Sequence, residues 1–208
     1  MQKWTQIFSD YIHALESADA AHDASHVHRV AVNSVKFSKL EGADLGIVIP
    51  ATWLHDCYTV SKKSELRTQA SRLSADKAEK LLKDWAYPQE NIEAIKHAIA
   101  AHSYSANIFP ETLEAKIVQD ADRMDSIGAI GVARMMMTGG KMDCTLYNDG
   151  DPFCQKRQPQ DRQWTVDHFY SKLLKLNSGF HTQAAKDEAQ RRHDYMLDFL
   201  KQLESEIL

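Results

Sequence analysis

The sequence predicts an all-α protein that folds as a single domain. Apolar residues recur at helical spacing along most of the chain, whereas alternating runs bounded by turn residues, which would indicate strands, are nearly absent. Glycine and proline together account for only thirteen residues (8 Gly and 5 Pro). With 208 residues, 43% of them hydrophobic, the chain is long enough to bury a core of its own.

The first two helices follow from apolar spacing and from their terminal residues. The first is amphipathic, because apolar residues fall at offsets 0, 3, 4, 7 and 11: Trp4, Ile7, Phe8, Tyr11 and Leu15. A second helix is expected from about His26 to Leu40. Ser25 is its expected N-cap, and Gly42 ends it.

The middle of the chain continues in helices. The segment 45–56, LGIVIPATWLHD, is too continuously apolar for a surface helix and should be buried. Pro50 inside it predicts either a kink or a late helix start. Charged and apolar residues at helical spacing predict a helix within 64–85, and Pro88 opens the next helix, which runs through Ile99.

The last part of the chain is expected to alternate between helix and loop. Apolar spacing over 111–137 predicts one long helical stretch that is interrupted at Gly128 and Gly131. Residues 138–163 contain Gly139-Gly140, an Asn-Asp-Gly-Asp-Pro run and a further proline, which predict a flexible loop. Two more helices complete the chain, at about 164–177 and 182–206.

The loop 138–163 is also a candidate lid that covers or borders the functional site, because long irregular loops tend to be functional or disordered. Its turn residues are compatible with a small hairpin at 140–154. Tyr147 either stacks on a base or anchors the loop. For Phe153, which follows a proline, burial in a core is the expected role.

Composition excludes several classes of function. A net charge of −4 (25 basic and 29 acidic residues) argues against a nucleic-acid polymer as partner. No apolar run approaches the roughly 18 residues that a membrane span needs, and charges interrupt the N-terminal apolar positions, so no signal peptide or membrane contact is expected. Cys57, Cys144 and Cys154 form no CxxC pair, which favours a reducing cytoplasm.

The dipeptide His-Asp occurs three times, and the neighbouring residues predict a different role for each occurrence that they allow us to place. His193-Asp194 lies on a charged helix face, where solvation is the expected role. His55-Asp56 directly follows the apolar run, so it should emerge at the edge of a buried segment. An ionised carboxylate in that position needs a partner, which is either a metal ion or a hydrogen-bonded histidine that joins two helices.

Further candidate ligands come from two other helices. Helical offsets place His26 on the core flank with Val30, and His28 about 200° around the helix, toward solvent. Asp120, Asp122 and Asp125 follow the apolar pair at 117–118, where they form either a solvated acidic turn or a cluster that needs a cation or an arginine.

Taken together, these segments supply two imidazoles and two carboxylates from three separate helices: His26, His55, Asp56 and Asp122. Such a mixed set is typical of a catalytic divalent metal with open water positions, and unlike the cysteine-rich sites of structural zinc. The sequence therefore predicts one divalent metal ion, with Mn, Co, Ni, Fe and Mg all open.

The ordered motifs HDxxHxxRV, LHD and DADRxD resemble the HD-domain metal-dependent phosphohydrolase superfamily over about Ala18 to Arg134. The AHSxSA and AKIVQDADRxxxxGAIGxAR segments are similar to those of compact bacterial members that resemble nucleotide pyrophosphohydrolases. The resemblance implies one HD-type domain over 1–208, with a metal-site core at about 18–134. It also implies the same four metal ligands, with Asp120 as the alternative to Asp122.

The resemblance implies hydrolysis of a small phosphorylated substrate, with a nucleotide as the expected class. A cytoplasmic monomer or homodimer is expected. Catalytic roles are expected for Asp56, His102 and Arg123, although Arg123 is also a candidate clamp for a neighbouring aspartate. Candidate substrate contacts are Lys63, Arg67, His97, His102 and Asp125. Solubility at the surface is the alternative role for Lys63 and Arg67.

Two other functions stay open on the sequence. One is a ligand-binding or regulatory module that keeps the metal but has no turnover. The other is a di-iron oxygenase of the same superfamily, which would need two additional histidine ligands. His97 and His102 are only five residues apart, roughly 140° around a helix, so both can face a second metal only if the helix ends between them. Phe169 and Tyr170 could serve a dimer interface or a core.

Overall fold

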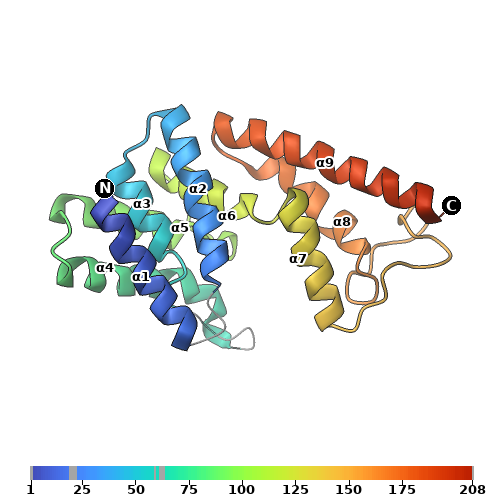
Figure 1. The fold of residues 1–208 in the computed structure, drawn as a ribbon, viewed down its shortest axis with the longest axis horizontal. Coiled ribbons are helices and arrows are strands. Elements are labelled where there is room, and N and C mark those ends of the chain that lie inside the picture. The colour runs from blue at the N-terminus through green and yellow to red at the C-terminus, as the bar shows by residue number, and fades with distance from the viewer. Residues whose placement is uncertain (1, 19–22, 59, 61–63, 208) are drawn as a thin grey trace. The chain divides into compact units, whose positions relative to one another are not determined.

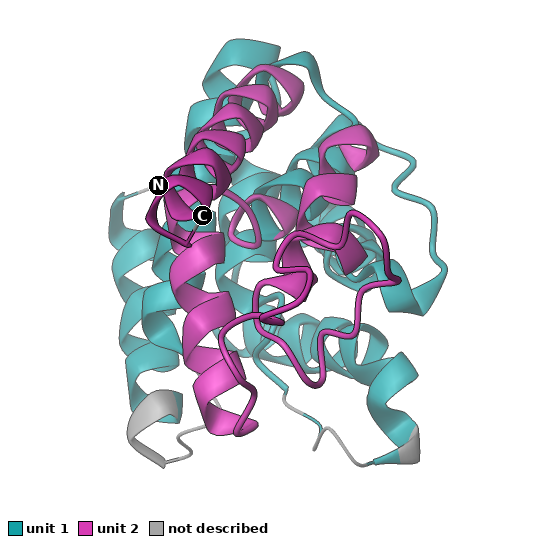
Figure 2. Ribbon diagram, turned by 90° about the vertical axis from the view of Figure 1, so that its right-hand side faces the viewer, with its two compact units in different colours: residues 1–122, 181–184 teal, residues 123–180, 185–208 magenta. Residues whose placement is uncertain are grey.

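The predicted all-α fold is confirmed in the computed structural model, which describes residues 2–18, 23–58, 60 and 64–207 (Figure 1). Within these residues the regular structure is helical, apart from one isolated β-bridge. The chain divides into two compact units, Met1–Asp122 with His181–Ala184, and Arg123–Phe180 with Ala185–Leu208 (Figure 2). We call them unit 1 and unit 2. That they act as one domain stays a prediction.

Unit 1 is a helical bundle in which α3 packs against α1, α2 and α5, and α4 packs against α5. Its core is formed by large apolar side chains from each of these helices, including Phe8, Phe37, Leu54, Leu82 and Ile95, all fully buried. The helices are α1 (Gln2–Ala18), α2 (Ala24–Glu41), α3 (Leu45–Leu54), α4 (Ala70–Asp84), α5 (Ile92–Ala101) and α6 (Leu113–Met124), with short 3-10 turns η1 (Glu65–Gln69), η2 (Gln89–Asn91) and η3 (Tyr104–Ala106).

Helix α2 begins earlier than the sequence predicted. Asp23, not Ser25, is the N-cap: its backbone is extended and its carboxylate accepts a hydrogen bond from the backbone N–H of His26 at 3.1 Å. A carboxylate at this position also interacts favourably with the helix dipole, an advantage that serine lacks. The predicted end at Gly42 is confirmed.

Helix α3 contains Pro50 in its interior, and Tyr87 compensates for it. Proline has no N–H, so the carbonyl of Gly46, four residues earlier, receives no intrahelical bond from position 50. The hydroxyl of Tyr87 donates to that carbonyl at 2.7 Å. The helix therefore runs through the proline, and the predicted burial of this segment is confirmed for residues 48–55.

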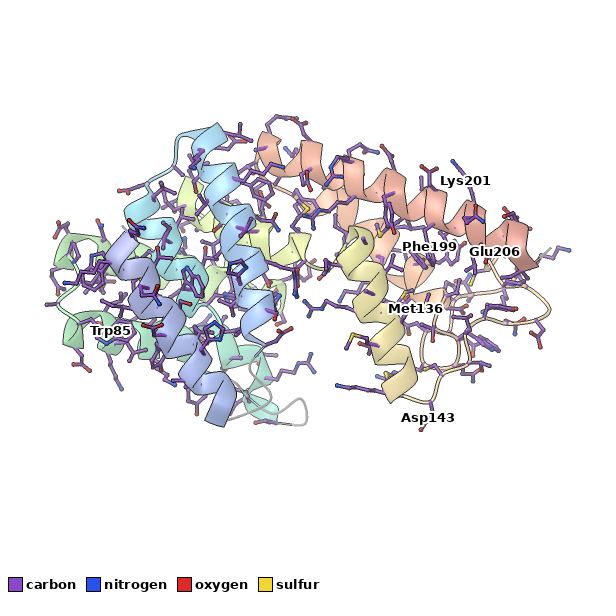
Figure 3. The ribbon with its side chains drawn as sticks, in the orientation of Figure 1. Trp85, Met136, Asp143, Phe199, Lys201 and Glu206 are labelled. Atoms are coloured by element: carbon purple, nitrogen blue, oxygen red, sulfur yellow. The ribbon has the colours of Figure 1, made fainter. Side chains whose placement is uncertain are left out.

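Aromatic rings join the first helix to the end of α4. Trp85, labelled in Figure 3, lies with its ring 5.8 Å from that of Phe8 and 5.4 Å from that of Tyr11. Phe8 and Tyr11 belong to the predicted amphipathic stripe of α1. The apolar face of this helix is thus partnered within unit 1.

Unit 2 contains α7 (Gly128–Lys141), α8 (Asp167–Ser171), η4 (Leu173–Gly179) and most of α9 (Gln183–Ile207). Gly128 has a φ of +76° and breaks the helical stretch as predicted. The predicted break at Gly131 is wrong. That residue lies inside α7, where a side chain would collide with the carbonyl of Ser126, so glycine permits close packing there.

The segment after α7 has no hairpin at 140–154 among the described residues. Thr145 instead forms an isolated parallel bridge with Trp164. Asp151 organises the turn, since its carboxylate accepts from the backbone N–H groups of Gln155 and Lys156. Because the Asp151 carboxylate pairs these two N–H groups, they need no hydrogen-bond partner from a neighbouring strand. The predicted flexibility of 138–163 and its role as a lid stay predictions.

A buried ion pair joins this loop to α8. Arg157 donates from its two terminal nitrogens to the carboxylate of Asp167 at 2.5 and 2.7 Å, and its guanidinium lies 4.4 Å from the centre of the Trp164 ring. The backbone N–H of Gln160 donates to the same carboxylate at 2.6 Å. Burial alone would raise the pKa of Asp167, but these bonds outweigh it and lower the pKa.

The C-terminal helices partly match the prediction. The expected helix at 164–177 is divided into α8 and η4, because the backbone of Lys172 leaves the helical region (φ −139°, ψ −59°). Phe169 and Phe153 are buried, and the Phe169 ring stacks on that of Phe199 of α9 with 5.8 Å between the ring centres. Phe169 therefore belongs to the core of unit 2.

The Tyr87 hydroxyl should stabilise α3 only because residue 50 is proline. We expect Tyr87→Phe to lower the free energy of unfolding by about 1 kcal/mol, as for a typical hydrogen bond. In a Pro50→Ala background, which restores an N–H donor for Gly46, the same change should cost less. Chemical denaturation of the four proteins of this cycle measures the coupling. Tyr195→Phe, at an exposed position on α9, is the control. Equal costs in both backgrounds would contradict the compensation.

Loss of Arg157 should leave the Asp167 carboxylate buried without its partner. We expect Arg157→Gln to lower the free energy of unfolding by about 3 kcal/mol at neutral pH. Because the pKa of Asp167 is lowered by folding, its contribution is present above the ordinary aspartate pKa and is lost as pH falls.

The difference between Arg157→Gln and the parent protein should therefore shrink below about pH 4. Urea denaturation between pH 3 and 7 measures it, with Lys156→Gln, at an exposed neighbouring position, as control. A difference that is constant over this range would contradict the assignment.

Candidate metal centre

His55 is the first residue after α3, and its imidazole is completely buried. Its Nδ1 lies 2.6 Å from the carbonyl oxygen of Thr52, one helical turn earlier. A carbonyl can only accept, so Nδ1 carries the proton and donates to it. The lone pair of the ring is thereby placed on Nε2, the nitrogen that faces the neighbouring carboxylates.

Nε2 of His55 is a buried polar atom without a hydrogen-bond partner in the described part of the chain. Two carboxylate oxygens lie just beyond hydrogen-bond distance, Asp56 Oδ2 at 3.5 Å and Asp122 Oδ1 at 3.8 Å. Leaving such an atom unpaired costs about 1–3 kcal/mol. A ligand that binds between the nitrogen and the two carboxylates would remove this cost.

His26 on α2 faces the same centre. Its Nε2 lies 3.2 Å from Asp122 Oδ1, and its ring centre is 5.5 Å from that of His55. His26, His55 and Asp56 each offer one ligand atom within 4.8 Å of the others. The predicted orientation of the two histidines of α2 is confirmed, since His26 is largely buried and His28 is exposed.

The protonation states of this cluster suit metal ligands. Burial lowers the pKa of His55 despite the neighbouring carboxylates, which favours the neutral imidazole. For Asp56, burial favours the protonated form, but the adjacent imidazoles of His55 and His102 hold the pKa of the carboxyl well below its usual range. Asp122 likewise has a lowered pKa, because the bond to His26 and the charge of His55 outweigh burial. Metals bind these same deprotonated forms.

His102 repeats the geometry of His55 at the end of α5. Its Nδ1 lies 2.7 Å from the carbonyl of Ile99, so Nε2 is the free nitrogen, and it lies 3.6 Å from Asp56 Oδ1. Its ring centre is 4.9 Å from that of His55. Burial opposes the charged form, but the nearby carboxylate of Asp56 outweighs it and raises the pKa of His102.

Asp120 and Asp122 of α6 have different environments. Asp120 is completely buried and accepts hydrogen bonds from the backbone N–H groups of His181 and Thr182, and from the Thr182 hydroxyl at 2.8 Å. Burial nevertheless raises the pKa of Asp120. Asp122 points to the histidine cluster. The geometry thus favours Asp122 as the ligand and gives Asp120 the task of fixing the start of α9.

Comparisons with known proteins identify the family of the chain. The HD domain family model matches residues 23–127, about half of the chain. YpgQ of Bacillus subtilis is 34% identical over 197 residues, which cover 93% of this chain and 88% of the relative. The chain belongs to the HD domain family.

Solved structures of HD domain proteins extend the likeness over both units. An HD-superfamily hydrolase from Bacillus thuringiensis superposes with a TM-score of 0.79 at 32% identity, over 99% of this chain and 97% of that one. The crystal structure of B. subtilis YpgQ in complex with ADP gives a TM-score of 0.75 at 32% identity, over 98% and 96% of the two chains. Within the residues described here, no helix is long and apolar enough to cross a membrane.

The other predicted site residues of this HD domain protein are less closely grouped. Arg67 lies exposed on η1, which packs against η3, two residues beyond His102. His97 is engaged elsewhere, because its Nε2 accepts a hydrogen bond from the backbone N–H of Glu111 at 3.1 Å. Lys63 lies outside the described residues.

Arg123 and Asp125 belong to unit 2. The Arg123 guanidinium lies 5.9 Å from the centre of the Phe180 ring. Asp125 follows the end of α6, is buried, and accepts a hydrogen bond from Arg134. Asp122 and Asp125, three residues apart, would share a face of a continuous helix, but α6 ends between them. Roles for both residues in catalysis or substrate binding stay predictions.

Sequence reasoning missed the two carbonyls that orient the histidines, those of Thr52 and Ile99. The signal was available: His55 and His102 each directly follow an apolar helix, where a ring can reach back to a carbonyl of the last helical turn. Such second contacts fix the tautomer of a ligand histidine.

Metal binding and folding should respond differently to the two aspartates of α6. We expect Asp122→Asn to weaken Mn²⁺ binding by about 100-fold or more, with little change in the melting temperature of the metal-free protein. Asp120→Asn should lower that melting temperature, because its amide would face N–H donors, but retain the metal. Calorimetric titration with Mn²⁺ and thermal unfolding in chelator measure both. The reverse pattern would make Asp120 the ligand.

Proposed function

We propose that this HD domain protein is a divalent-metal-dependent phosphohydrolase that acts on a small nucleotide in the cytoplasm. The observation that carries the proposal is the buried Nε2 of His55, unpaired in the described structure and flanked by Asp56, Asp122 and His26. This donor set fits a divalent cation with open positions for water and substrate. Manganese is the metal that we would test first.

The four proposed ligands are His26, His55, Asp56 and Asp122. A cation held by them would polarise a phosphate oxygen and lower the pKa of a water molecule, so that hydrolysis proceeds near neutral pH. The protein would contribute by fixing the tautomers of His55 and His102 and by keeping the carboxylates of Asp56 and Asp122 ionised in the metal-free state. The lowered pKa values of Asp56 and Asp122 support this role.

His102 is proposed as a catalytic residue that contacts the phosphate. Its Nδ1 is occupied by the carbonyl of Ile99, so its Nε2 is the atom that can donate a hydrogen bond to a phosphate oxygen. Asp56, 3.6 Å away, favours the protonated ring that such a donor requires. Positioning and positive charge at the oxygens are the main needs of phosphoryl transfer.

Arg67 is proposed to hold the outer part of the substrate. Its element, η1, packs against η3, which begins two residues after His102, and its side chain is exposed. A guanidinium suits the bidentate recognition of phosphate. Lys63, His97 and Asp125 stay proposals for substrate contacts, and Arg123 stays a proposal for a catalytic role.

A nucleotide is the proposed substrate class because YpgQ, a relative of similar length, was crystallised in complex with ADP. The di-iron alternative is less well supported, since it needs two further histidines at the centre. Of the two candidates, His97 accepts a hydrogen bond from the backbone of Glu111, whereas His102 lies 3.6 Å from Asp56. Monomer and homodimer both remain proposals for the oligomeric state.

The function can be tested by reconstituting chelated protein with Mn²⁺, Co²⁺, Ni²⁺ or Mg²⁺ and measuring phosphate and pyrophosphate release from nucleoside mono-, di- and triphosphates. We expect turnover with at least one transition ion, and none in chelator. His26→Gln should abolish it, whereas His28→Gln, two residues along the same helix and exposed, should retain it. Metal binding without turnover on any phosphorylated compound would favour a binding module.

His102→Gln should lower kcat/KM about 100-fold, because it removes a charged donor to the reacting phosphate. Arg67→Gln should act mainly on KM, since it is expected to hold a part of the substrate that does not react. Steady-state kinetics on the best substrate distinguish the two. An unchanged kcat in His102→Gln, with Mn²⁺ affinity retained, would remove His102 from the catalytic set.

A further inference from the structure

Unit 2 contains a pocket of about 440 Å³ that the proposed function does not use. Its walls are α7, the end of the following loop, α8 and the start of η4, and every residue that lines it belongs to unit 2. The proposed metal ligands all belong to unit 1. A volume of this size is within the usual range for small-molecule sites, about 300–1,000 Å³.

The pocket is lined by more positive than negative groups. Arg134, Arg162 and Lys172 line it, with Asp161 as the one acidic lining residue. The guanidinium of Arg134 is already bonded to the buried carboxylate of Asp125. Among the described residues, neither Arg162 nor Lys172 has a carboxylate within ion-pair distance. Two exposed cations are therefore available to an anionic ligand.

The carboxylate of Asp161, the acidic residue of the pocket, is hydrogen-bonded to two neighbouring side chains. Asp161 accepts hydrogen bonds from Nδ1 of His168 at 2.8 Å and from the hydroxyl of Ser171 at 2.7 Å. These two bonds lower the pKa of Asp161, so that it remains an acceptor. His168 is thereby held with Nε2 as its unused nitrogen. The repulsion that a free carboxylate would exert on an anion is reduced by these partners.

The rest of the lining combines hydroxyl and apolar groups. Ser126, Thr138 and Thr165 provide hydroxyls, while Met135, Met142 and Leu173 provide apolar surface. Methionine side chains adapt to flat or irregular apolar ligands. An inorganic ion would leave this apolar part unused, so the lining indicates a ligand with both a charged and an apolar part.

Close packing fixes the base of the pocket. At Gly139, near the end of α7, a side chain would collide with that of Thr165, which precedes α8. Cys144 and Thr145 extend this contact, because the N–H of Cys144 donates to the carbonyl of Gly139 and Thr145 exchanges backbone bonds with the 163–165 segment. The two walls are thus held together by the protein itself, as expected of a preformed site.

We propose that this pocket binds a small organic phosphate, with Arg162 and Lys172 contacting the phosphate and Met135, Met142 and Leu173 contacting the apolar part. Two cations and neighbouring hydroxyls suit a dianionic phosphate better than a single carboxylate. The inference does not depend on the metal centre, since it uses only residues of unit 2.

Calorimetric titration of the full-length protein in excess chelator tests the proposal, with phenyl phosphate as probe and inorganic phosphate as reference. We expect phenyl phosphate to bind at least tenfold more tightly than phosphate, because only it has an apolar part. Arg162→Gln and Lys172→Gln should each raise its Kd about tenfold, as for the loss of a charged hydrogen bond. Lys175→Gln, on η4 but outside the pocket, should leave the Kd unchanged.

Four outcomes would overturn the proposal: no binding of phenyl phosphate, equal weakening by Lys175→Gln, binding only after Mn²⁺ is added, or tenfold weaker binding in Arg67→Gln. The last result would place the ligand at the metal centre. Because the titration is done without metal, its outcome is independent of whether the protein hydrolyses nucleotides.

Discussion

The candidate site depends on one constraint, a buried imidazole whose orientation is fixed by the helix before it. His55 donates from Nδ1 to the carbonyl of Thr52, which leaves its Nε2 as a buried acceptor between two carboxylates. His102 makes the equivalent bond to Ile99. Two helix ends therefore present the same nitrogen toward one aspartate, Asp56, and each ring is held by a carbonyl of the last turn of its helix.

Much of this centre could be predicted from the sequence because helical spacing determines which side chains share a face. It distinguished His26 from His28 correctly. It failed for Asp122 and Asp125, since the helix ends at Met124, and it could not separate Asp120 from Asp122 by itself. That separation depends on contacts with residues 181 and 182, about sixty positions later, which local spacing does not contain.

Local rules also failed where tertiary contacts compensate for an unfavourable residue. Pro50 suggested a kink or a late start for α3; the late start is wrong, since the helix begins at Leu45 and the Tyr87 hydroxyl satisfies the carbonyl that proline leaves unpaired, while the kink stays a prediction. Gly131 suggested a helix break, yet it allows α7 to approach Ser126. In unit 2, residues 157 and 167 form an ion pair, and α7 and α8 line one pocket. Both features depend on contacts between separate segments. From its composition, this region could be predicted only as a loop.

The bonds from Asp120 to His181 and Thr182 have a consequence for the path of the chain. They return residues 181–184 to unit 1 before α9 continues in unit 2, so the polypeptide passes between the units three times. Unit 2 is consequently not a contiguous module that a gene fusion or truncation could move intact. A cut in the loop after α7 would leave each fragment with segments of both units.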